Sequence, residues 1–240
     1  MRIDFTNQAA LVTGGTRGIG KQVADDLADL GAQVMITGTK EPLQEMKENV
    51  HFVRADFLDD ESTQDFIELI SKESFDVCIN NAGINRVDPI CEVKQEDWDD
   101  IIKVNLSTPF RIQQAVTGAM VKNRYGRIIN IASVWSTIST PHRASYSSSK
   151  FGLRGLTLAS AAELAKHNVL INTVSPGFIL TDMTKNILGP ERMEEISRQI
   201  PMRRMAETDE ISRVILFVAS QLNTYISGQN IIADGGFVGV

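Results

Sequence analysis

Residues 9–20 read Ala-Ala-Leu-Val-Thr-Gly-Gly-Thr-Arg-Gly-Ile-Gly, and this stretch decides the fold. An apolar run of strand type leads through glycines at 14, 18 and 20 into a segment of helical period. Glycine allows a tight turn and a close approach of the backbone, and the N-terminus of a helix offers free N–H groups and a positive dipole to a phosphate. We therefore predict a dinucleotide-binding turn. A plain glycine turn is the alternative, disfavoured by the position directly after the first strand.

Outward from this turn, short apolar runs alternate with stretches of helical period. The predicted strands are Gln8–Val12, Gln33–Thr37, Val50–Arg54, Asp76–Asn80, Arg127–Ala132, Val169–Val174 and Asn230–Ala233. The predicted helices span residues 18–30, 41–48, 61–72, 97–120, 146–166 and 208–220. Nearly continuous apolar strands alternating with helices indicate a doubly wound α/β fold, with a parallel sheet covered on both faces. We expect a single domain over residues 1–240, because the sequence has no repeat and no linker.

The composition is that of an ordinary globular protein. The chain has 240 residues, of which 42% are hydrophobic and 22% charged, and its net charge is −6. This charge gives no attraction for nucleic acid or anionic membranes. Two cysteines and three scattered histidines give neither a disulfide framework nor a metal site. Neither a signal peptide nor a window of 18 apolar residues is visible, so we expect a soluble cytoplasmic protein.

Residues 181–207 form a long connection rich in Met, Arg and Glu, with Gly189, Pro190 and Pro201 as helix breakers. Long connections in compact domains are often functional, so this segment is a candidate lid over a substrate site. An ordinary surface insertion fits the composition equally well.

The end of the second predicted strand indicates which dinucleotide is bound. An acidic residue there would hold the ribose 2′-hydroxyl of NAD, but residues 36–40 read Ile-Thr-Gly-Thr-Lys. Arg17 in the glycine turn, together with Thr37, Thr39 and Lys40, suits a 2′-phosphate. We therefore predict NADP(H) as the cofactor. In the alternative interpretation, Arg17 and Lys40 are solvated surface cations.

Polar residues also follow the third and fourth predicted strands. The Asp56 carboxylate could accept a hydrogen bond from the adenine amino group, with Phe57 beside it, although an Asp in a strand-end turn is common. The small residues of Asn80–Gly83 would let the backbone lie against a ribose. Of the two asparagines in this run, we expect one to tie neighbouring strands together and the other to face the cofactor.

Tyr146 and Lys150 lie four residues apart at the start of a predicted helix, which puts both on one face. Ser133 follows the fifth predicted strand, and ligands of open parallel sheets bind outside the carboxyl ends of the strands. Reducing a carbonyl with a nicotinamide hydride requires a proton donor, but a free phenol has a pKa of about 10. The Lys150 ammonium and the charge of oxidised nicotinamide would lower the pKa of Tyr146, while Ser133 would position the substrate oxygen.

Each of these features is commonplace alone, but the combination is specific. The glycine turn Thr13–Gly20, Asn80–Gly83, Ser133, Tyr146 with Lys150, and Pro176-Gly177 resemble the short-chain dehydrogenase/reductase family over about residues 5–236. The resemblance implies a seven-stranded Rossmann sheet and a catalytic Ser–Tyr–Lys centre. It also implies a fourth catalytic residue, Asn105, which in the family holds a water in a proton relay from the lysine. Pairing through the helices at 97–120 and 146–166 would give a homotetramer.

The resemblance further implies contacts to the nicotinamide half of the cofactor from Pro176, Gly177, Ile179 and Thr181. Lys150 would also hold the nicotinamide ribose. The complete set of residues expected to contact the cofactor is Gly14, Thr16, Arg17, Gly18, Ile19, Gly20, Thr37, Thr39, Asp56, Phe57, Asn81, Ala82, Gly83, Tyr146, Lys150, Pro176, Gly177, Ile179 and Thr181.

Within the family, the chain resembles most the bacterial 3-oxoacyl-(acyl-carrier-protein) reductases, through runs such as Asn81–Arg86, Tyr125–Ile128 and Ile200–Met205. The implied activity is NADP(H)-dependent hydride transfer between nicotinamide and a carbonyl or secondary alcohol, with a 3-oxoacyl thioester as substrate. The resemblance also implies a docking site for the acidic acyl carrier protein, to which Arg127 would contribute.

Four positions depart from that subgroup. Arg143 stands where Gln is usual, Trp135 where a smaller residue is usual, His167 in place of a second docking arginine, and Asp234 in place of Asn. Arg143 and Trp135 could shape a polar or anionic pocket for a sugar, polyol or keto acid. Alternatively, Arg143 faces solvent and Trp135 packs under the lid. A regulator that senses NADP(H) without turnover is a remoter alternative, because such proteins typically lose the tyrosine or lysine.

Overall fold

In the computed structural model, which describes residues 2–42 and 45–239, the predicted strands form one parallel sheet. The strands are β1 (Ala9–Val12), β2 (Gln33–Gly38), β3 (Val50–Arg54), β4 (Val77–Asn80), β5 (Gly126–Ile131), β6 (Val169–Pro176) and β7 (Asn230–Ala233). Their order is β3-β2-β1-β4-β5-β6-β7. This arrangement confirms the predicted seven-stranded, doubly wound sheet.

Burial explains why the central strands are apolar. Every residue of β4, β5 and β6 is buried, because helices cover both faces of the sheet there. The order of the strands reverses between β1 and β4, whose register pairs Ala10 with Val77 and Val12 with Ile79. A crevice therefore opens at the carboxyl ends of β1 and β4, where ligands of such sheets bind.

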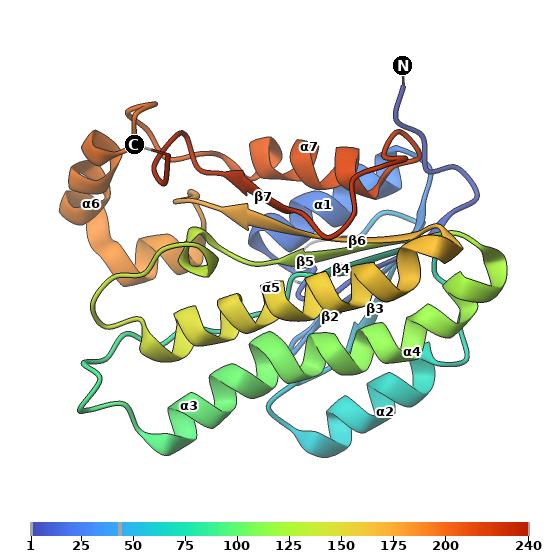
Figure 1. The fold of residues 1–240 in the computed structure, drawn as a ribbon, viewed down its shortest axis with the longest axis horizontal. Helices are drawn as coiled ribbons and strands as arrows, with labels where there is room; N and C mark the ends of the chain where they lie inside the picture. The colour runs from blue at the N-terminus through green and yellow to red at the C-terminus, as the bar shows by residue number, and fades with distance from the viewer. Residues whose placement is uncertain (1, 43–44, 240) are drawn as a thin grey trace.

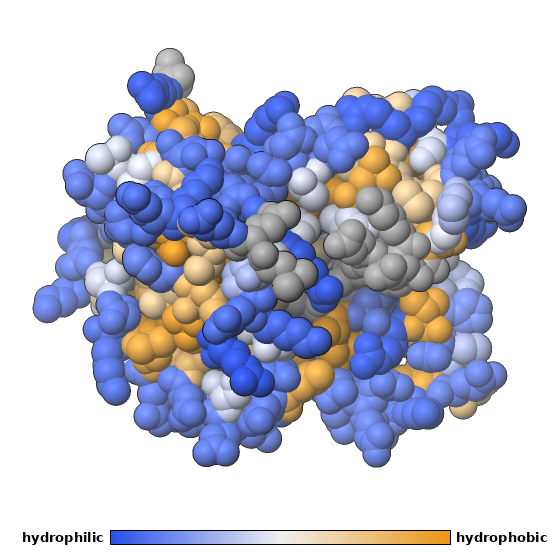
Figure 2. Space-filling model, turned by 180° about the vertical axis from the view of Figure 1, so that it is seen from behind, coloured by the Kyte–Doolittle hydropathy of each residue, from blue (hydrophilic) through white to orange (hydrophobic). Residues whose placement is uncertain are grey.

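The helices are α1 (Gly18–Asp29), α2 (Asp60–Ile70), α3 (Gln95–Ile102), α4 (Thr108–Asn123), α5 (Ala144–Leu164), α6 (Asp182–Gln199) and α7 (Thr208–Ala219). Helices α1 and α7 cover one face of the sheet and α2 to α5 lie on the other, while α6 lies beyond the end of the sheet (Figure 1). One apolar core lies under α1 and α7, and a second lies under α2, α4 and α5. Within the described residues, no helix combines the length and apolarity needed to cross a membrane. Seen from behind, the surface is mainly hydrophilic, with separate hydrophobic areas (Figure 2).

The helix predicted over 41–48 is wrong for the residues described there, which form no helix; residues 43–44 lie outside the described part. Contacts with the C-terminal part of α1 hold the end of this connection instead. Lys47 Nζ donates to the Asp25 carbonyl oxygen, and Asn49 Nδ2 donates to the Ala28 and Ala32 carbonyl oxygens. These bonds attach the connection to the last turns of α1 and to the loop that follows it.

The helix predicted over 97–120 is divided into α3 and α4 by the wider, π-helical turn Lys103–Ser107. Pro109 explains the interruption, since it has no N–H to donate to the carbonyl four residues earlier. The candidate lid is helical over α6 but is interrupted at Gly189, whose φ of 70° is not helical. A proline follows this glycine and favours the break.

Candidate active site

The glycine turn is built from backbone conformations and close contacts that require glycine. Gly14 and Gly18 have φ angles of 64° and 57°, in the left-handed region. A Cβ atom on Gly20 would lie 2.4 Å from both Asn81 Nδ2 and the Gly14 carbonyl oxygen. The turn is anchored on β2, because Thr37 Oγ1 accepts a hydrogen bond from Gly14 N at 3.2 Å.

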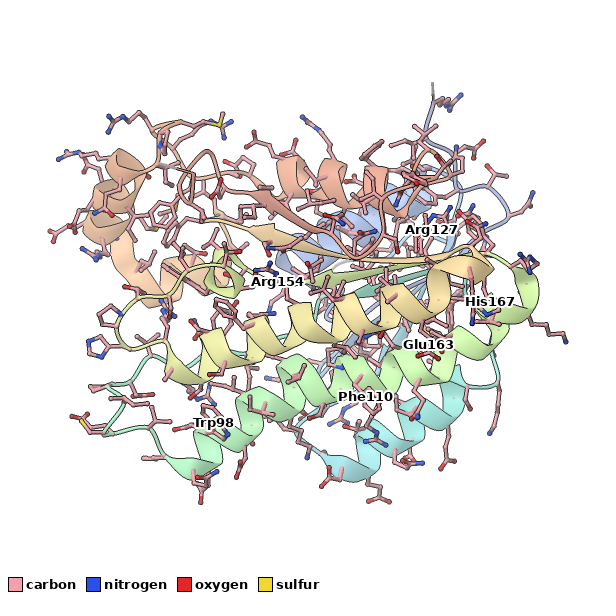
Figure 3. All side chains as sticks on the ribbon, in the orientation of Figure 1. Trp98, Phe110, Arg127, Arg154, Glu163 and His167 are labelled. Atoms are coloured by element: carbon pink, nitrogen blue, oxygen red, sulfur yellow. The ribbon has the colours of Figure 1, made fainter. Side chains whose placement is uncertain are left out.

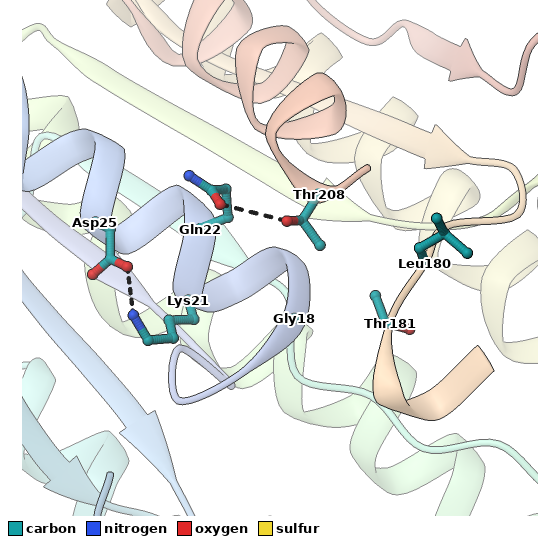
Figure 4. Close-up of a pocket in the computed structure, with 7 residues that line it drawn as sticks. All are labelled: Gly18, Lys21, Gln22, Asp25, Leu180, Thr181 and Thr208. Carbon is teal, nitrogen blue, oxygen red and sulfur yellow. Dashed lines mark hydrogen bonds and ion pairs between the residues drawn. The ribbon is translucent and has the colours of Figure 1, made fainter. Parts of the chain in front are cut away.

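The start of α1 fits the phosphates of a dinucleotide. The first backbone N–H groups of a helix have no intrahelical partner and attract anions, and the first turn of α1 carries no acidic residue. Thr181 lies beside this turn, with its Cγ2 3.6 Å from where a Gly18 Cβ would be. A cavity of about 260 Å³ opens between the two segments (Figure 4). Its lining residues are Gly18, Lys21, Gln22, Asp25, Leu180, Thr181 and Thr208.

The two asparagines after β4 both make structural hydrogen bonds with their amide nitrogens. Asn80 Nδ2 donates to Asn130 Oδ1 at 2.8 Å within the sheet. Asn81 Nδ2 donates to the carbonyl oxygens of Thr13 and Gly14 at 3.0 and 3.1 Å. The amide nitrogen of the Asn81 side chain is therefore occupied by the glycine turn.

Thr13 is a residue of the site that sequence reasoning missed. Its hydroxyl oxygen accepts hydrogen bonds from the backbone N–H groups of Asn81 and Ala82, both at 3.0 Å, and so joins the ends of β1 and β4. The available signal was a hydroxyl residue that ends an otherwise apolar strand just before the glycines.

The residues expected around a 2′-phosphate separate into two groups. Arg17, Thr39 and Lys40 are exposed. Their segments lie side by side, because a Cβ on Gly38 would be 2.6 Å from Thr16 Cγ2. Thr37, in contrast, is only 1% exposed, and its hydroxyl supports the turn. The expectation that its side chain reaches the phosphate therefore needs correction.

The expected adenine contacts are also constrained. Asp56 Oδ1 accepts a hydrogen bond from Leu58 N at 3.0 Å, the geometry of a strand-end turn. The Phe57 ring is buried and packs on Phe66, with 5.6 Å between ring centroids. Phe57 therefore belongs to the core, and only its backbone remains available to a nucleotide.

The structure brings together the three side chains expected to react. Ser133 lies close enough to the Tyr146 phenol to lower the pKa of that group. Lys150 Nζ lies 5.6 Å from the centroid of the Tyr146 ring and donates to the Ile131 carbonyl oxygen at 2.7 Å. Ile131 ends β5, so the sheet itself holds the ammonium group below the phenol.

The electrostatics differ from the expectation that Lys150 lowers the pKa of Tyr146. Burial raises the pKa of Tyr146 above its usual value, and the Ser133 hydroxyl and the Arg143 guanidinium oppose this increase. Burial also lowers the pKa of Lys150 to about 8, which still leaves this group mostly protonated at neutral pH. The cation that lowers the pKa of Tyr146 is Arg143.

Asn105 lies in the π-helical turn between α3 and α4 and is fully buried. Its Oδ1 accepts from Ile84 N at 2.9 Å, and its Nδ2 donates to the Ile84 carbonyl oxygen and to Ser149 Oγ. A Cβ on Gly83 would lie 3.3 Å from Asn105 Oδ1 and 3.7 Å from Lys150 Nζ, so glycine keeps these groups close. Ser149 was not predicted, although it lies next to Lys150 in the motif.

The loop after β6 carries the residues expected on the nicotinamide side. Pro176 ends β6, and a Cβ on Gly177 would lie 2.8 Å from the Asp234 Cα, so glycine permits the close approach of the C-terminal segment. Ile179 is buried and pairs with Ala206 in an isolated bridge. Thr181 caps α6, since its hydroxyl oxygen accepts from Thr184 N at 3.3 Å.

Arg127 does not provide the expected docking surface. Its side chain is 3% exposed and donates to the carbonyl oxygens of Gly126, Asn168 and Asn223. It lies near His167, at the opposite end of the molecule from the start of α5 (Figure 3). A buried guanidinium needs such acceptors, and this arginine joins the amino end of the sheet to the loops around it.

Trp135 packs in an aromatic cluster with Phe178 and Phe237. Its ring meets both edge-on, with centroid distances of 6.2 and 6.3 Å. Trp135 N also donates to Ser133 Oγ at 3.3 Å. This bond is made by the Trp135 backbone, so the Ser133 hydroxyl caps the short turn Val134–Ser136 that carries Trp135.

Comparisons with known proteins agree with this site. Residues 14–238 match a family model described as enoyl-(acyl carrier protein) reductase. The chain is 39% identical to a 3-oxoacyl-(acyl-carrier-protein) reductase of Aquifex aeolicus, covering 98% of this chain and 99% of that protein. It is 38% identical to the reductase of the same name from Escherichia coli, covering 98% of each.

A solved structure described as an NAD(P)-dependent gluconate 5-dehydrogenase of Beutenbergia cavernae, with NADP bound at low occupancy, is also similar. Its TM-score is 0.94 at 32% identity, over 99% of both chains. The sequence match and the structural match both extend over nearly the whole chain. The protein therefore belongs to the short-chain dehydrogenase/reductase family and is an oxidoreductase.

Proposed function

We propose that this chain transfers a hydride between NADP(H) and a carbonyl or secondary alcohol, with Ser133, Tyr146 and Lys150 as catalytic residues. The observation that carries the proposal is the position of Lys150, whose Nζ lies 5.6 Å from the centroid of the Tyr146 ring and is held by the carbonyl oxygen of Ile131 at the end of β5, two residues before Ser133. NADP(H), when bound, supplies or accepts the hydride.

In the reduction direction, the Tyr146 phenol donates the proton that the substrate oxygen requires. Its raised pKa keeps it protonated near neutral pH, so that the proton is present when a carbonyl enters. Ser133 donates a hydrogen bond that orients the same oxygen. Lys150 holds the nicotinamide ribose and, with Asn105, returns protons to the phenol.

The nucleotide is held at the carboxyl ends of β1 and β4. The first N–H groups of α1 and the glycines at 14, 18 and 20 bind the pyrophosphate, and Thr181 closes the site from the side of α6. Arg17, with Thr39 and Lys40, binds the 2′-phosphate and selects NADP(H). Residues 181–207 act as the lid of this single domain, which spans residues 1–240.

For the substrate, the curated relatives favour a 3-oxoacyl thioester, because both are named for that activity. A second candidate is a sugar, polyol or keto acid. Two observations favour it: Arg127 is buried away from any carrier protein, and Arg143 puts a positive charge beside Tyr146. The name of the similar gluconate dehydrogenase agrees with this second candidate.

Exposed apolar side chains on α4 and α5 support assembly into a homotetramer. Phe110 is 49% exposed, Phe151 44% and Leu158 54%. Burying these side chains between copies would remove apolar surface from water. The tetramer is proposed to work in the cytoplasm.

The test is Tyr146→Phe, assayed by NADPH absorbance with a panel of acyl thioesters, keto sugars and keto acids. We expect kcat to fall by about 10²–10⁴-fold, while the Kd for NADPH changes less than about twofold. Tyr225→Phe is the matched control, because Tyr225 is 97% exposed, and it should retain full activity. Equal turnover by Tyr146→Phe and wild type would eliminate the assigned proton donor.

A further inference from the structure

Arg143 carries a charge that neither the proposed hydride transfer nor the fold uses. It directly precedes α5, three residues before Tyr146. Its Nη1 atom is buried, and no hydrogen-bond acceptor for that atom is found among the described residues. Arg143 also takes part in none of the ion pairs found there. A guanidinium donor that is buried without an acceptor costs free energy, so a functional partner is expected.

The position of Arg143 makes this lack of a partner more costly. The N-terminus of a helix carries a partial positive charge, and a cation there is unfavourable. The first turn of α5 contains no acidic residue that would balance it. The preceding residue, His142, has a φ of 67°, a left-handed conformation that is unfavourable for a non-glycine residue. The local fold thus holds an unbalanced positive charge at this point.

Arg143 is the N-cap residue of α5, and Tyr146 lies in the first turn of that helix. The Arg143 guanidinium is close enough to Tyr146 for each group to alter the pKa of the other. An anionic group paired with Arg143 would therefore lie only a few bonds from a carbonyl held by Tyr146 and Ser133.

We infer that Arg143 binds the carboxylate of the substrate, and that this chain acts on short oxo- and hydroxycarboxylates. The inference rests on the proposed function and names its substrate class. A carboxylate fits the fork of a guanidinium through two parallel hydrogen bonds. Trp135 follows Ser133 by two residues, and its large ring is packed against Phe178 and Phe237.

The first test compares a short oxo acid with its neutral amide, in wild type, Arg143→Gln and Arg143→Lys. We expect wild type to prefer the acid, and Arg143→Gln to lose about 10- to 100-fold in kcat/KM for the acid, mainly through KM. The amide should change less than about threefold. Arg143→Lys keeps the positive charge but lacks the two-pronged guanidinium, so its kcat/KM for the acid should lie between those of wild type and Arg143→Gln. The same variant replaces Arg143→Gln in the test if Arg143→Gln does not fold.

Arg213→Gln is the matched control for net charge. Arg213 is an exposed arginine on α7, paired with Asp209. Its loss should leave the ratio of acid to amide unchanged. The variants also distinguish carboxylate binding from an effect on proton donation. If Arg143 acts only on the pKa of Tyr146, its loss shifts the pH profile of kcat for the acid and the amide alike. If Arg143 binds the carboxylate, its loss changes KM for the acid only.

A second readout needs no turnover. Isothermal titration of a saturated carboxylic acid, which has no carbonyl to reduce, should show binding to the wild-type protein, with and without NADPH, and at least tenfold weaker binding to Arg143→Gln. Equal acid and amide kinetics, or equal loss of both in Arg143→Gln, would overturn the inference while leaving the proposed function intact. If wild type turned over none of the carbonyl compounds, the proposed function itself would fail.

Discussion

The sharpest structural prediction concerns the methyl group that Gly20→Ala would insert under the glycine turn. The new Cβ would lie 2.4 Å from Asn81 Nδ2 and 2.4 Å from the Gly14 carbonyl oxygen. Those two atoms are hydrogen bonded to each other at 3.1 Å, and the same amide also binds the Thr13 carbonyl oxygen. The methyl group must therefore displace the Asn81 side chain or the turn itself.

The expected cost follows from these contacts. Losing two hydrogen bonds costs about 2 kcal/mol, and crowding a methyl group against packed atoms adds roughly 1–3 kcal/mol. Alanine is a better helix former than glycine and offsets about 1 kcal/mol of this. We expect the free energy of unfolding to fall by about 2–4 kcal/mol. Affinity for NADPH should also fall by at least about tenfold, because the displaced turn is the proposed phosphate site.

The free energy of unfolding is measured by urea unfolding at a fixed protein concentration. The affinity for NADPH is measured separately, by titration of the folded protein. Gly118→Ala on α4 is the matched control, because no atom lies within 4 Å of its added Cβ. That substitution should raise stability by about 0.5–1 kcal/mol through helix propensity alone. If Gly20→Ala were as stable as Gly118→Ala and bound NADPH normally, the reasoning about the glycine turn would be refuted.

Three further predictions concern single side chains. Lys150 has a pKa of about 8 in the folded chain, against 10.5 in the unfolded chain, so between these pH values the unfolded chain binds more protons. The free energy of unfolding should therefore rise with pH over this range in the wild type, but not in Lys150→Met. Arg17→Leu should weaken NADPH binding about 10-fold or more in fluorescence titrations while changing NADH binding little. Arg127→Lys should lower the free energy of unfolding by about 2–3 kcal/mol, because one ammonium cannot reach the three carbonyl oxygens that the guanidinium binds.

Each of these predictions has a result that would contradict it. Parallel pH profiles of stability for wild type and Lys150→Met would show that burial does not perturb Lys150. An equal loss of NADPH and NADH binding in Arg17→Leu would remove the argument for the 2′-phosphate. An Arg127→Lys variant with the stability of wild type would mean that the carbonyl contacts of this arginine contribute little.

Patterns along the sequence predicted the strands correctly, because burial alone determines which residues a central strand contains. The strands are buried on both faces, so their apolar runs left little room for another interpretation. The prediction of a helix over 41–48 was wrong because the conformation of this connection depends on distant residues: Lys47 and Asn49 bind the backbone of α1. The π-helical turn had a local signal in Pro109, which periodicity alone could not weigh against a continuous helix.

The candidate site follows the same division. The residue types and spacing of Ser133, Tyr146 and Lys150 were sufficient to predict that they share a crevice, because the carboxyl ends of parallel strands meet at one edge. Sequence could not distinguish the exposed Arg17 from the buried Arg127, since both are single arginines near strand ends. Burial is a property of the assembled layers, and it reversed the expected role of Arg127.

The amino-acid sequence by itself therefore determined the topology and led to the proposed cofactor-binding turn and the proposed reacting groups, because each depends on side-chain chemistry and on neighbours along the chain. Only the tertiary structure decided which cation acts on the Tyr146 phenol. Burial lowers the pKa of Lys150, whereas Arg143 keeps a donor without an acceptor among the described residues. Desolvation and unmet hydrogen bonds arise from contacts between distant segments, so no pattern along the chain records them.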